Sequence, residues 1–228
     1  MNNFFAAPTG EGGDETVRLT SAGILTIVAV IVALIVIALI VRRVQSGEKS
    51  FKITSRQLVF SAAAMALAMV TSMLKLFEMP MGGSVTLCSM LFIVLIGYWY
   101  GPYVGLMTGV AYGLLQFVLE PIFYTIPQML VDYPLAFGAL GLSGFFCNKK
   151  HGLQTGYAAG VLGRYVFAFL SGLLFFADYA PEGMNPAVYS LLYNGGYLCA
   201  EAVITLILIS LPPVAKAMAQ VKRQATEG

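Results

Sequence analysis

The chain is poor in the residues that enzymes and metal sites use. It has one histidine, His151, in a polar stretch, and three widely separated cysteines. No CxxC or Cys/His spacing of a metal site occurs, so we interpret Cys88, Cys147 and Cys199 as small buried hydrophobic residues. No P-loop sequence is present, which excludes ATP hydrolysis of that kind by this chain.

One motif resembles that of a membrane enzyme. Residues 141–144 read GLSG, which matches the GxSG of intramembrane serine proteases. Such an enzyme needs a histidine inside a neighbouring helix to activate its serine, and His151 lies outside the apolar runs. We therefore interpret Ser143 as a small residue that lets helices approach closely. The sequence predicts no catalytic residue, no metal site and no cofactor.

Charge is also scarce. Only 11% of the residues are charged, 58% are hydrophobic and the net charge is +2. A soluble domain of this length could not bury so much apolar surface, whereas a lipid bilayer accepts an apolar exterior. No basic patch with interleaved aromatic residues occurs, so nucleic acid is excluded as a partner. The composition therefore predicts a protein embedded in the lipid bilayer.

Long hydrophobic runs recur along the chain, and a spanning helix needs roughly 20 apolar residues. The run Gly23–Val41 is too long for a signal peptide and follows an acidic stretch, so we interpret it as a retained helix. We predict an all-α integral membrane protein with one extra N-terminal transmembrane helix and a six-helix bundle. The six helices are expected at residues 56–76, 85–100, 103–119, 127–147, 153–177 and 187–214.

Polar stretches divide the chain into five parts. We expect a polar extracellular tail without regular structure at residues 1–20, the extra transmembrane helix within 21–44, a cytoplasmic linker at 45–55, a six-helix substrate-binding membrane domain at 56–215 and a cytoplasmic tail at 216–228.

Lysine and arginine residues orient these spans. They cluster at residues 42–56, 149–150 and 216–223, and seven alternating spans place all three clusters on one side of the membrane. The positive-inside rule makes that side the cytoplasm. We therefore predict a multi-pass protein of the plasma membrane, with its N-terminus outside and its C-terminus in the cytoplasm.

Three ionisable residues fall well inside predicted spans, where an unpartnered charge is costly. Arg164 and Glu201 have similar predicted depths, since a helix rises about 1.5 Å per residue. We expect them to form a buried ion pair, with a role in substrate binding as the alternative.

Asp132 has no basic residue at its predicted depth. A carboxylate among aromatic rings suits an organic cation, because the rings add stacking and cation–π attraction to the counter-charge. The alternative is that Asp132 caps a helix that restarts near Pro134. The polar and aromatic residues expected near it are Gln116, Gln128, Tyr133, Phe176, Tyr179, Tyr189 and Asn194.

The helix predicted at 56–76 carries a stripe of small residues. Alanines recur four positions apart in two pairs, and such stripes allow close packing of helices within a chain or between partners. The two pairs are Ala62 with Ala66 and Ala64 with Ala68.

Several segments together resemble one known family. The stretch MPMGGSVTL at 79–87, the stretch PQMLVDYPLAFGALG at 127–141, and both AVYS at 187–190 and NG at 194–195 are similar to sequences of the ThiT/YuaJ proteins. These proteins are thiamine-specific S components of energy-coupling factor (ECF) transporters. The resemblance extends over residues 56–215 and leaves out only the extra N-terminal helix and the two ends.

The resemblance implies a six-helix S-component bundle with a vitamin site near the outer surface and a lid between its first two helices. It implies that the chain captures thiamine for import and docks through its alanine stripe on a transmembrane coupling subunit joined to two ATPases, which alone use ATP. An S component for another vitamin or precursor, and a solitary ion-coupled carrier, remain the alternatives. The resemblance implies Asp132, Tyr133, Tyr189 and Asn194 as site residues. Together with the residues expected around Asp132, the predicted substrate-binding residues are Asp132, Tyr133, Tyr189, Asn194, Phe176, Gln128 and, in the lid, Gly83.

Overall fold

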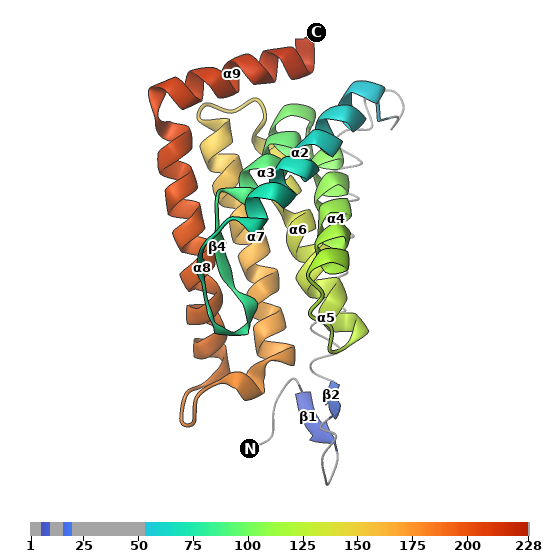
Figure 1. Cartoon of the computed structure of the whole chain (residues 1–228), viewed down its shortest axis with the longest axis vertical. Coiled ribbons are helices and arrows are strands. Elements are labelled where there is room, and N and C mark those ends of the chain that lie inside the picture. The colour runs from blue at the N-terminus through green and yellow to red at the C-terminus, as the bar shows by residue number, and fades with distance from the viewer. Residues whose placement is uncertain (1–5, 10–15, 20–52, 228) are drawn as a thin grey trace.

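The computed structural model describes residues 6–9, 16–19 and 53–227 (Figure 1). The extra transmembrane helix predicted within 21–44 lies outside the described residues, as does most of the linker predicted at 45–55.

Residues 53–227 form a helical bundle. Five helical segments are long and apolar enough to cross a membrane, and the 12-residue α3 is a shorter apolar helix among them. This arrangement confirms the six-helix part of the predicted fold. The segments are α2 (Ser55–Met73), α3 (Ser89–Tyr100), α4 (Pro102–Leu119), the composite segment Ile126–Phe146, α7 (Gly152–Phe175) and α8 (Pro186–Ser210).

Local sequence signals explain where helices begin and end. Thr54 and Gln57 form a reciprocal capping box at the start of α2, which satisfies two backbone N–H groups there. Gly101 separates α3 from α4 with a φ of 88°, an angle that suits glycine. Pro102 then opens α4, where its missing N–H costs nothing.

The fourth segment changes its helical type along its length. It comprises α5 (Ile126–Leu130), the π-helical turn η2 (Val131–Leu135), α6 (Ala136–Gly138) and the 3₁₀ segment η3 (Ala139–Phe146). Pro134 lies in the π-helical turn, and such turns often mark functional sites.

Small residues hold η3 tightly against its neighbours. Ser143 is fully buried and its Oγ donates to the carbonyl oxygen of Val94 at 2.8 Å. A Cβ on Gly141 would collide with the backbone of Leu106, so only glycine allows this approach of η3 to α4. The geometry supports the interpretation of Ser143 as a packing residue.

A β-hairpin lies between the first two membrane helices. It comprises β3 (Lys75–Glu78), the short 3₁₀ turn η1 (Pro80–Gly82) and β4 (Ser84–Thr86). The predicted helices at 56–76 and 85–100 were therefore wrong at these ends. The turn needs Gly82, whose φ is 89°.

The C-terminal region also differs from the prediction. Helix α8 ends at Ser210, because Pro212 and Pro213 follow and disfavour a continuous helix. The chain then turns into α9 (Pro212–Glu227), which crosses one end of the bundle (Figure 1). The predicted helix end at residue 214 was thus wrong, and residues 216–227 of the predicted tail are helical. Lys222 Nζ on α9 donates to the carbonyl oxygen of Cys147 at 2.8 Å.

Part of the predicted N-terminal tail has regular structure. Strand β1 (Ala6–Thr9) pairs antiparallel with β2 (Thr16–Leu19), with Ala6 opposite Leu19. The expectation of a tail without regular structure was therefore wrong for these residues.

The alanine pairs of α2 do not share one face. Ala64 and Ala68 are buried against the bundle, whereas Ala62 and Ala66 are exposed. Positions two apart on a helix point in nearly opposite directions, because each residue turns the chain by about 100°. A docking surface on α2 can therefore include Ala62 and Ala66 but not Ala64 and Ala68.

Candidate ligand-binding site

A cavity of about 420 Å³ lies inside the bundle, in the size range of small-molecule sites. Its wall comes from the ends of α2 and α4, the start of α3, η2 and α6, the second half of α7 and the first two thirds of α8. The β3–β4 hairpin covers it. Six of the seven predicted binding residues line this cavity, namely Asp132, Tyr133, Tyr189, Asn194, Phe176 and Gly83.

The seventh predicted residue, Gln128, lies behind the wall. It is fully buried and its Nε2 donates to Asp132 Oδ2 at 2.6 Å and to the carbonyl oxygen of Ile122 at 3.1 Å. Its Oε1 accepts from the backbone N–H of Tyr124 at 3.1 Å. Gln128 is therefore not part of the cavity lining, and its side chain orients Asp132, while its contact with a substrate stays a prediction.

Asp132 lies on the π-helical turn and faces the cavity. The helical backbone continues through Pro134, since residues 130–139 keep right-handed helical angles at each junction. The hydrogen bond of Asp132 is to a side chain and not to free backbone N–H groups. The geometry therefore favours the cation-site interpretation over the capping alternative.

Tyr133 presents its ring to the cavity while its hydroxyl is occupied elsewhere. Its Oη donates to the carbonyl oxygen of Glu120 and accepts from the N–H of Ile122, both at 2.8 Å. The ring also packs edge-on against Phe117. Tyr133 thus fixes the loop after α4 and offers a ligand an aromatic surface.

One face of α8 lines the cavity with residues spaced four positions apart. Tyr189, Tyr193, Tyr197 and Glu201 follow at this interval, which places them in one row on a helix. The ring centroids of Tyr189 and Tyr193 lie 5.7 Å apart, and those of Tyr193 and Tyr197 lie 6.0 Å apart. The sequence analysis missed Tyr193 and Tyr197, although this period of four was visible in the sequence.

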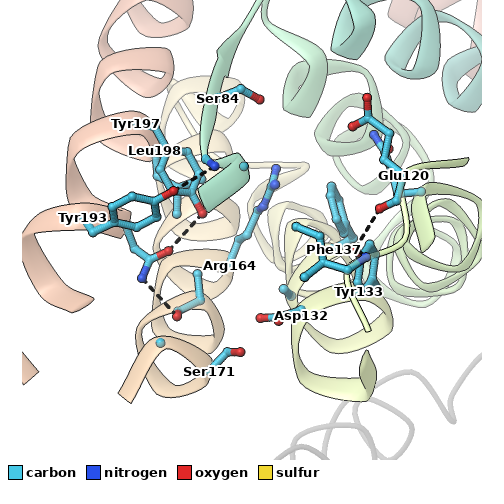
Figure 2. Close-up of a pocket in the computed structure, with 18 of the residues that line it drawn as sticks. Ser84, Glu120, Asp132, Tyr133, Phe137, Arg164, Ser171, Tyr193, Tyr197 and Leu198 are labelled. Carbon is cyan, nitrogen blue, oxygen red and sulfur yellow. Dashed lines mark hydrogen bonds between the residues drawn. The ribbon is translucent and has the colours of Figure 1, made fainter. Parts of the chain in front are cut away.

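Asn194 connects α8 to α7. Its Nδ2 donates to the carbonyl oxygens of Ala168 and Ser190 at 3.2 and 3.0 Å. Its Oδ1 accepts from Tyr197 Oη at 3.0 Å (Figure 2). Asn194 is therefore a cavity residue that also positions Tyr197.

The hairpin is fastened over the cavity by Tyr193. The N–H of Gly83 donates to Tyr193 Oη at 2.9 Å, and that hydroxyl donates in turn to the carbonyl oxygen of Pro80. A second contact lies at Lys75, whose Nζ is 3.1 Å from Glu78 and 3.6 Å from Glu120 at the end of α4. The hydrogen bond to Glu78 raises the pKa of Lys75.

Aromatic rings surround the outer edge of the cavity. The ring of Phe176 packs edge-on against Tyr124, with centroids 5.3 Å apart, and lies 6.0 Å from the ring of Tyr179. The hydroxyls of Tyr124 and Tyr179 are 2.9 Å apart, and this hydrogen bond raises the pKa of Tyr179. Phe176 therefore belongs to an aromatic cluster that joins α7 to the loop before α5.

Glu201 does not pair with Arg164, so that prediction was wrong. Its carboxylate is buried and accepts hydrogen bonds from the N–H and Oγ1 of Thr86, at 3.0 and 2.6 Å, and from the N–H of Met90 at 3.3 Å. Ser89 Oγ contributes a longer bond of 3.4 Å. Glu201 thus binds the start of α3, where Cys88 provides no capping side chain.

Arg164 points into the cavity from α7. Its guanidinium carbon lies 4.0 Å from the ring centroid of Phe137. Figure 2 shows its side chain extending between the tyrosines of α8 and Phe137. In the same view Ser171 and Asp132 point toward one another from α7 and η2.

These features define a helical membrane protein with an aromatic cavity, of the size of small-molecule sites, beneath a β-hairpin. Within the described residues, no group of three or more His, Cys, Asp and Glu side chains could hold a metal ion. The chain belongs to the thiamine transporter protein (Thia_YuaJ) family, whose model matches residues 58–221. It is therefore a transport protein and not an enzyme.

Individual relatives agree with this assignment. The chain is 35% identical over 167 residues to the thiamine transporter ThiT of Bacillus subtilis, which covers 67% of this chain and 85% of that protein. It is 33% identical over 107 residues to ThiT of Lacticaseibacillus paracasei, which covers 41% and 51% of the two chains. The solved structure of ThiT from Listeria monocytogenes has a similar fold, with a TM-score of 0.56 and 24% identity over 69% of this chain and 94% of that chain.

Proposed function

We propose that this protein is the substrate-binding S component of an ECF transporter and captures thiamine from outside the cell. The observation that carries the proposal is the carboxylate of Asp132 on the wall of an aromatic cavity under a hairpin lid. The thiazolium ring of thiamine has a permanent positive charge, which a carboxylate and aromatic faces both attract. The thiamine transporter relatives support the choice of this cation.

The cavity residues have separate roles in this proposal. Asp132 supplies the counter-charge, and Tyr133, Tyr189 and Phe176 supply ring faces for stacking. Asn194 offers a polar edge at the junction of α7 and α8. The hairpin with Gly83 closes over the bound vitamin and excludes water.

Import requires partners in this proposal, because the chain has no nucleotide-binding motif. A transmembrane coupling subunit and two ATPase subunits of an ECF module would supply the energy, and ATP would be used only by those partners. The exposed pair Ala62 and Ala66 offers a flat surface on α2 where a partner helix could approach closely. The rest of the exposed apolar surface faces lipid.

The orientation follows from the charge distribution. Lys149 and Lys150 lie at the end of the bundle that α9 crosses, and α9 carries Lys216, Lys222 and Arg223. The positive-inside rule assigns this end to the cytoplasm of a plasma-membrane protein. The cavity then opens toward the outer surface, where a vitamin would arrive.

Calorimetric titration of the detergent-purified protein with thiamine tests this proposal. Calorimetry is preferable to intrinsic tryptophan fluorescence, because Trp99 packs against Phe60 and Tyr100 away from the cavity wall. Saturable one-to-one binding, lost in Asp132→Ala, supports thiamine as the ligand and α5–η2 as its site. Absence of heat at two well-separated temperatures from folded protein freed of copurified ligand would refute thiamine as the ligand.

A transport assay tests the role of the partners. Cells that express this chain together with an ECF module should accumulate labelled thiamine, and cells that lack every ECF module should not. Accumulation without any module would contradict the S-component proposal and favour a solitary carrier.

A further inference from the structure

Helix α9 lies across the end of the bundle that is opposite the cavity, and contacts with aromatic side chains fix it there (Figure 1). Tyr100 Oη donates to the carbonyl oxygen of Ala225 at 3.0 Å, and Lys222 Nζ lies 3.9 Å from the ring centroid of Tyr98. Tyrosine and tryptophan side chains concentrate where a membrane meets water. These contacts therefore indicate that α9 lies at the depth of the lipid headgroups.

The two faces of α9 differ in their chemistry. Met218, Lys222 and Ala225 follow at spacings of four and three, so they share the face that packs on the bundle. Lys216 and Arg223 lie on the opposite face and are exposed. They are seven positions apart, which is about 10 Å along the helix axis. A helix that is apolar on one face and has lysine and arginine on the other is typical of helices that lie in the membrane surface.

The end of the bundle that α9 crosses is strongly basic. Within residues 53–227 it has six basic residues and one acidic residue, Glu227. The ion pairs among these residues all involve Lys75 at the other end, so no salt bridge joins this basic cluster to a carboxylate of the chain. Clusters of about four to eight lysines and arginines beside a membrane helix attract anionic lipids. The basic cluster consists of Arg56, Lys149, Lys150, Lys216, Lys222 and Arg223.

From this placement and charge we infer that α9 binds the phosphate groups of anionic phospholipids, with Lys216 and Arg223 as its headgroup contacts. The guanidinium of an arginine binds phosphate through paired N–H bonds, and the ammonium of a lysine adds a compact charge. The aromatic contacts hold α9 at headgroup depth, which favours a lipid over an acidic protein surface as the occupant. The inference depends on the fold and charge of this end and not on the proposed function.

The inference is tested by measuring which lipids the full-length protein retains. The protein is purified in mixed micelles that contain equal amounts of phosphatidylglycerol and phosphatidylcholine, and native mass spectrometry counts each bound lipid. The wild-type protein should retain more phosphatidylglycerol than phosphatidylcholine. Lys216→Gln together with Arg223→Gln should lower this enrichment by at least about fivefold, because each basic residue near the surface adds to the attraction. The enrichment should also fall as the salt concentration is raised.

Two controls separate the position of the charges from their number. Lys216→Arg together with Arg223→Lys keeps both charges and should retain most of the enrichment. Lys75→Gln and Lys216→Gln each remove one exposed positive charge, at opposite ends of the bundle, and only Lys216→Gln should lower the enrichment. An unchanged midpoint of thermal unfolding in phosphatidylcholine micelles shows that each variant is folded.

Three outcomes would overturn the inference. Equal retention of the two lipids by the wild-type protein would do so, and would favour an acidic protein surface as the occupant. Unchanged enrichment in the double glutamine variant would exclude Lys216 and Arg223 as the headgroup contacts. An equal fall in Lys75→Gln and Lys216→Gln would reflect net charge alone. No vitamin is present in these measurements, so their outcome is independent of the thiamine proposal.

Discussion

The two cavity carboxylates on η2 and α8 are held in different ways, and this difference separates their roles. Asp132 has one side-chain donor, Gln128, and faces the cavity. Glu201 is 3% exposed and is surrounded by donors from Thr86, Ser89 and Met90. A carboxylate with spare acceptor capacity can bind a ligand, whereas one that is saturated mainly stabilises the fold.

Asp132→Asn should therefore impair thiamine binding with little effect on folding. We expect a loss of about 2–5 kcal/mol, or about 30-fold or more in affinity, because the bound cation loses its counter-charge. An uncharged analogue of thiamine should lose far less. Titration of both ligands measures the difference, and Asp178→Asn, an exposed carboxylate outside the cavity, is the control. Equal losses for the two ligands would contradict the charge-pairing role.

Glu201→Gln should instead lower stability. The amide places N–H donors against the donors of Thr86 and Met90, and buried polar groups without partners cost about 1–3 kcal/mol each. The midpoint of thermal unfolding in detergent should fall by several degrees. Glu182→Gln, which changes an exposed loop carboxylate, should leave the midpoint unchanged. An unchanged midpoint in Glu201→Gln would show that these hydrogen bonds contribute nothing net.

Among the elements of the fold, the β3–β4 hairpin is the one proposed to control how easily a ligand enters and leaves, because it covers the cavity. Its backbone approaches α8 so closely that a Cβ on Gly83 would lie 2.8 Å from Tyr193 Oη and 2.9 Å from Tyr197 Cδ1. Only a residue without a side chain fits there in the closed position. The hairpin also reaches the end of α4 through Lys75 and Glu120.

Gly83→Ala should push the hairpin away from α8 and weaken its hydrogen bond to Tyr193. We expect thiamine to dissociate faster by about tenfold, since one hydrogen bond and its packing contribute about 1–1.5 kcal/mol. Stopped-flow displacement measures the rate. Gly195→Ala is the control, because its added Cβ would be 3.5 Å from the Tyr165 hydroxyl, an ordinary contact. An unaltered rate in Gly83→Ala would mean that the hairpin is not the lid.

The Lys75 contact predicts the pH dependence of the lid. The pKa of Lys75 is raised above 10.5 by Glu78, so the protonated form is stabilised in the folded hairpin. The contribution of this contact to the stability of the folded hairpin is fully present below the ordinary lysine pKa. It is lost as the pH rises through the raised pKa of Lys75. Loss of this contact should therefore leave thiamine dissociation unchanged below about pH 9 and accelerate it only above about pH 10.5. In Lys75→Met the alkaline acceleration should be smaller.

At the scale of the whole molecule, the cavity lies at the end opposite to the lysines of the 149–150 loop and of α9. Lysines of the loop at 149–150 and of α9 gather at one end, and Lys222 fastens α9 there through the carbonyl oxygen of Cys147 and the ring of Tyr98. The loop between α7 and α8 lies near the cavity end with Asp178 and Glu182. The asymmetry fits one orientation in a membrane.

Cysteine labelling in intact cells tests that orientation. In a variant without Cys88, Cys147 and Cys199, a cysteine placed at Glu182 should react with a membrane-impermeant maleimide from outside. A cysteine placed at Lys150 should react only after the cells are permeabilised. The opposite pattern would place the cavity on the cytoplasmic side and contradict uptake from outside.

The sequence alone determined the membrane class and the approximate positions of six helices, and six of the seven residues predicted to bind a substrate lie on the cavity wall. These features depend on local composition. The length of an apolar run predicts a membrane span, and a carboxylate inside such a run indicates a functional residue. Only the tertiary structure decided what Gln128, Glu201, Arg164 and the alanine pairs do. Their roles depend on which donors and rings from distant segments come within hydrogen-bond reach, and depth along a helix does not specify its rotation. Arg164 and Glu201 have similar predicted depths. They nevertheless contact different residues, because their helices turn them toward different neighbours.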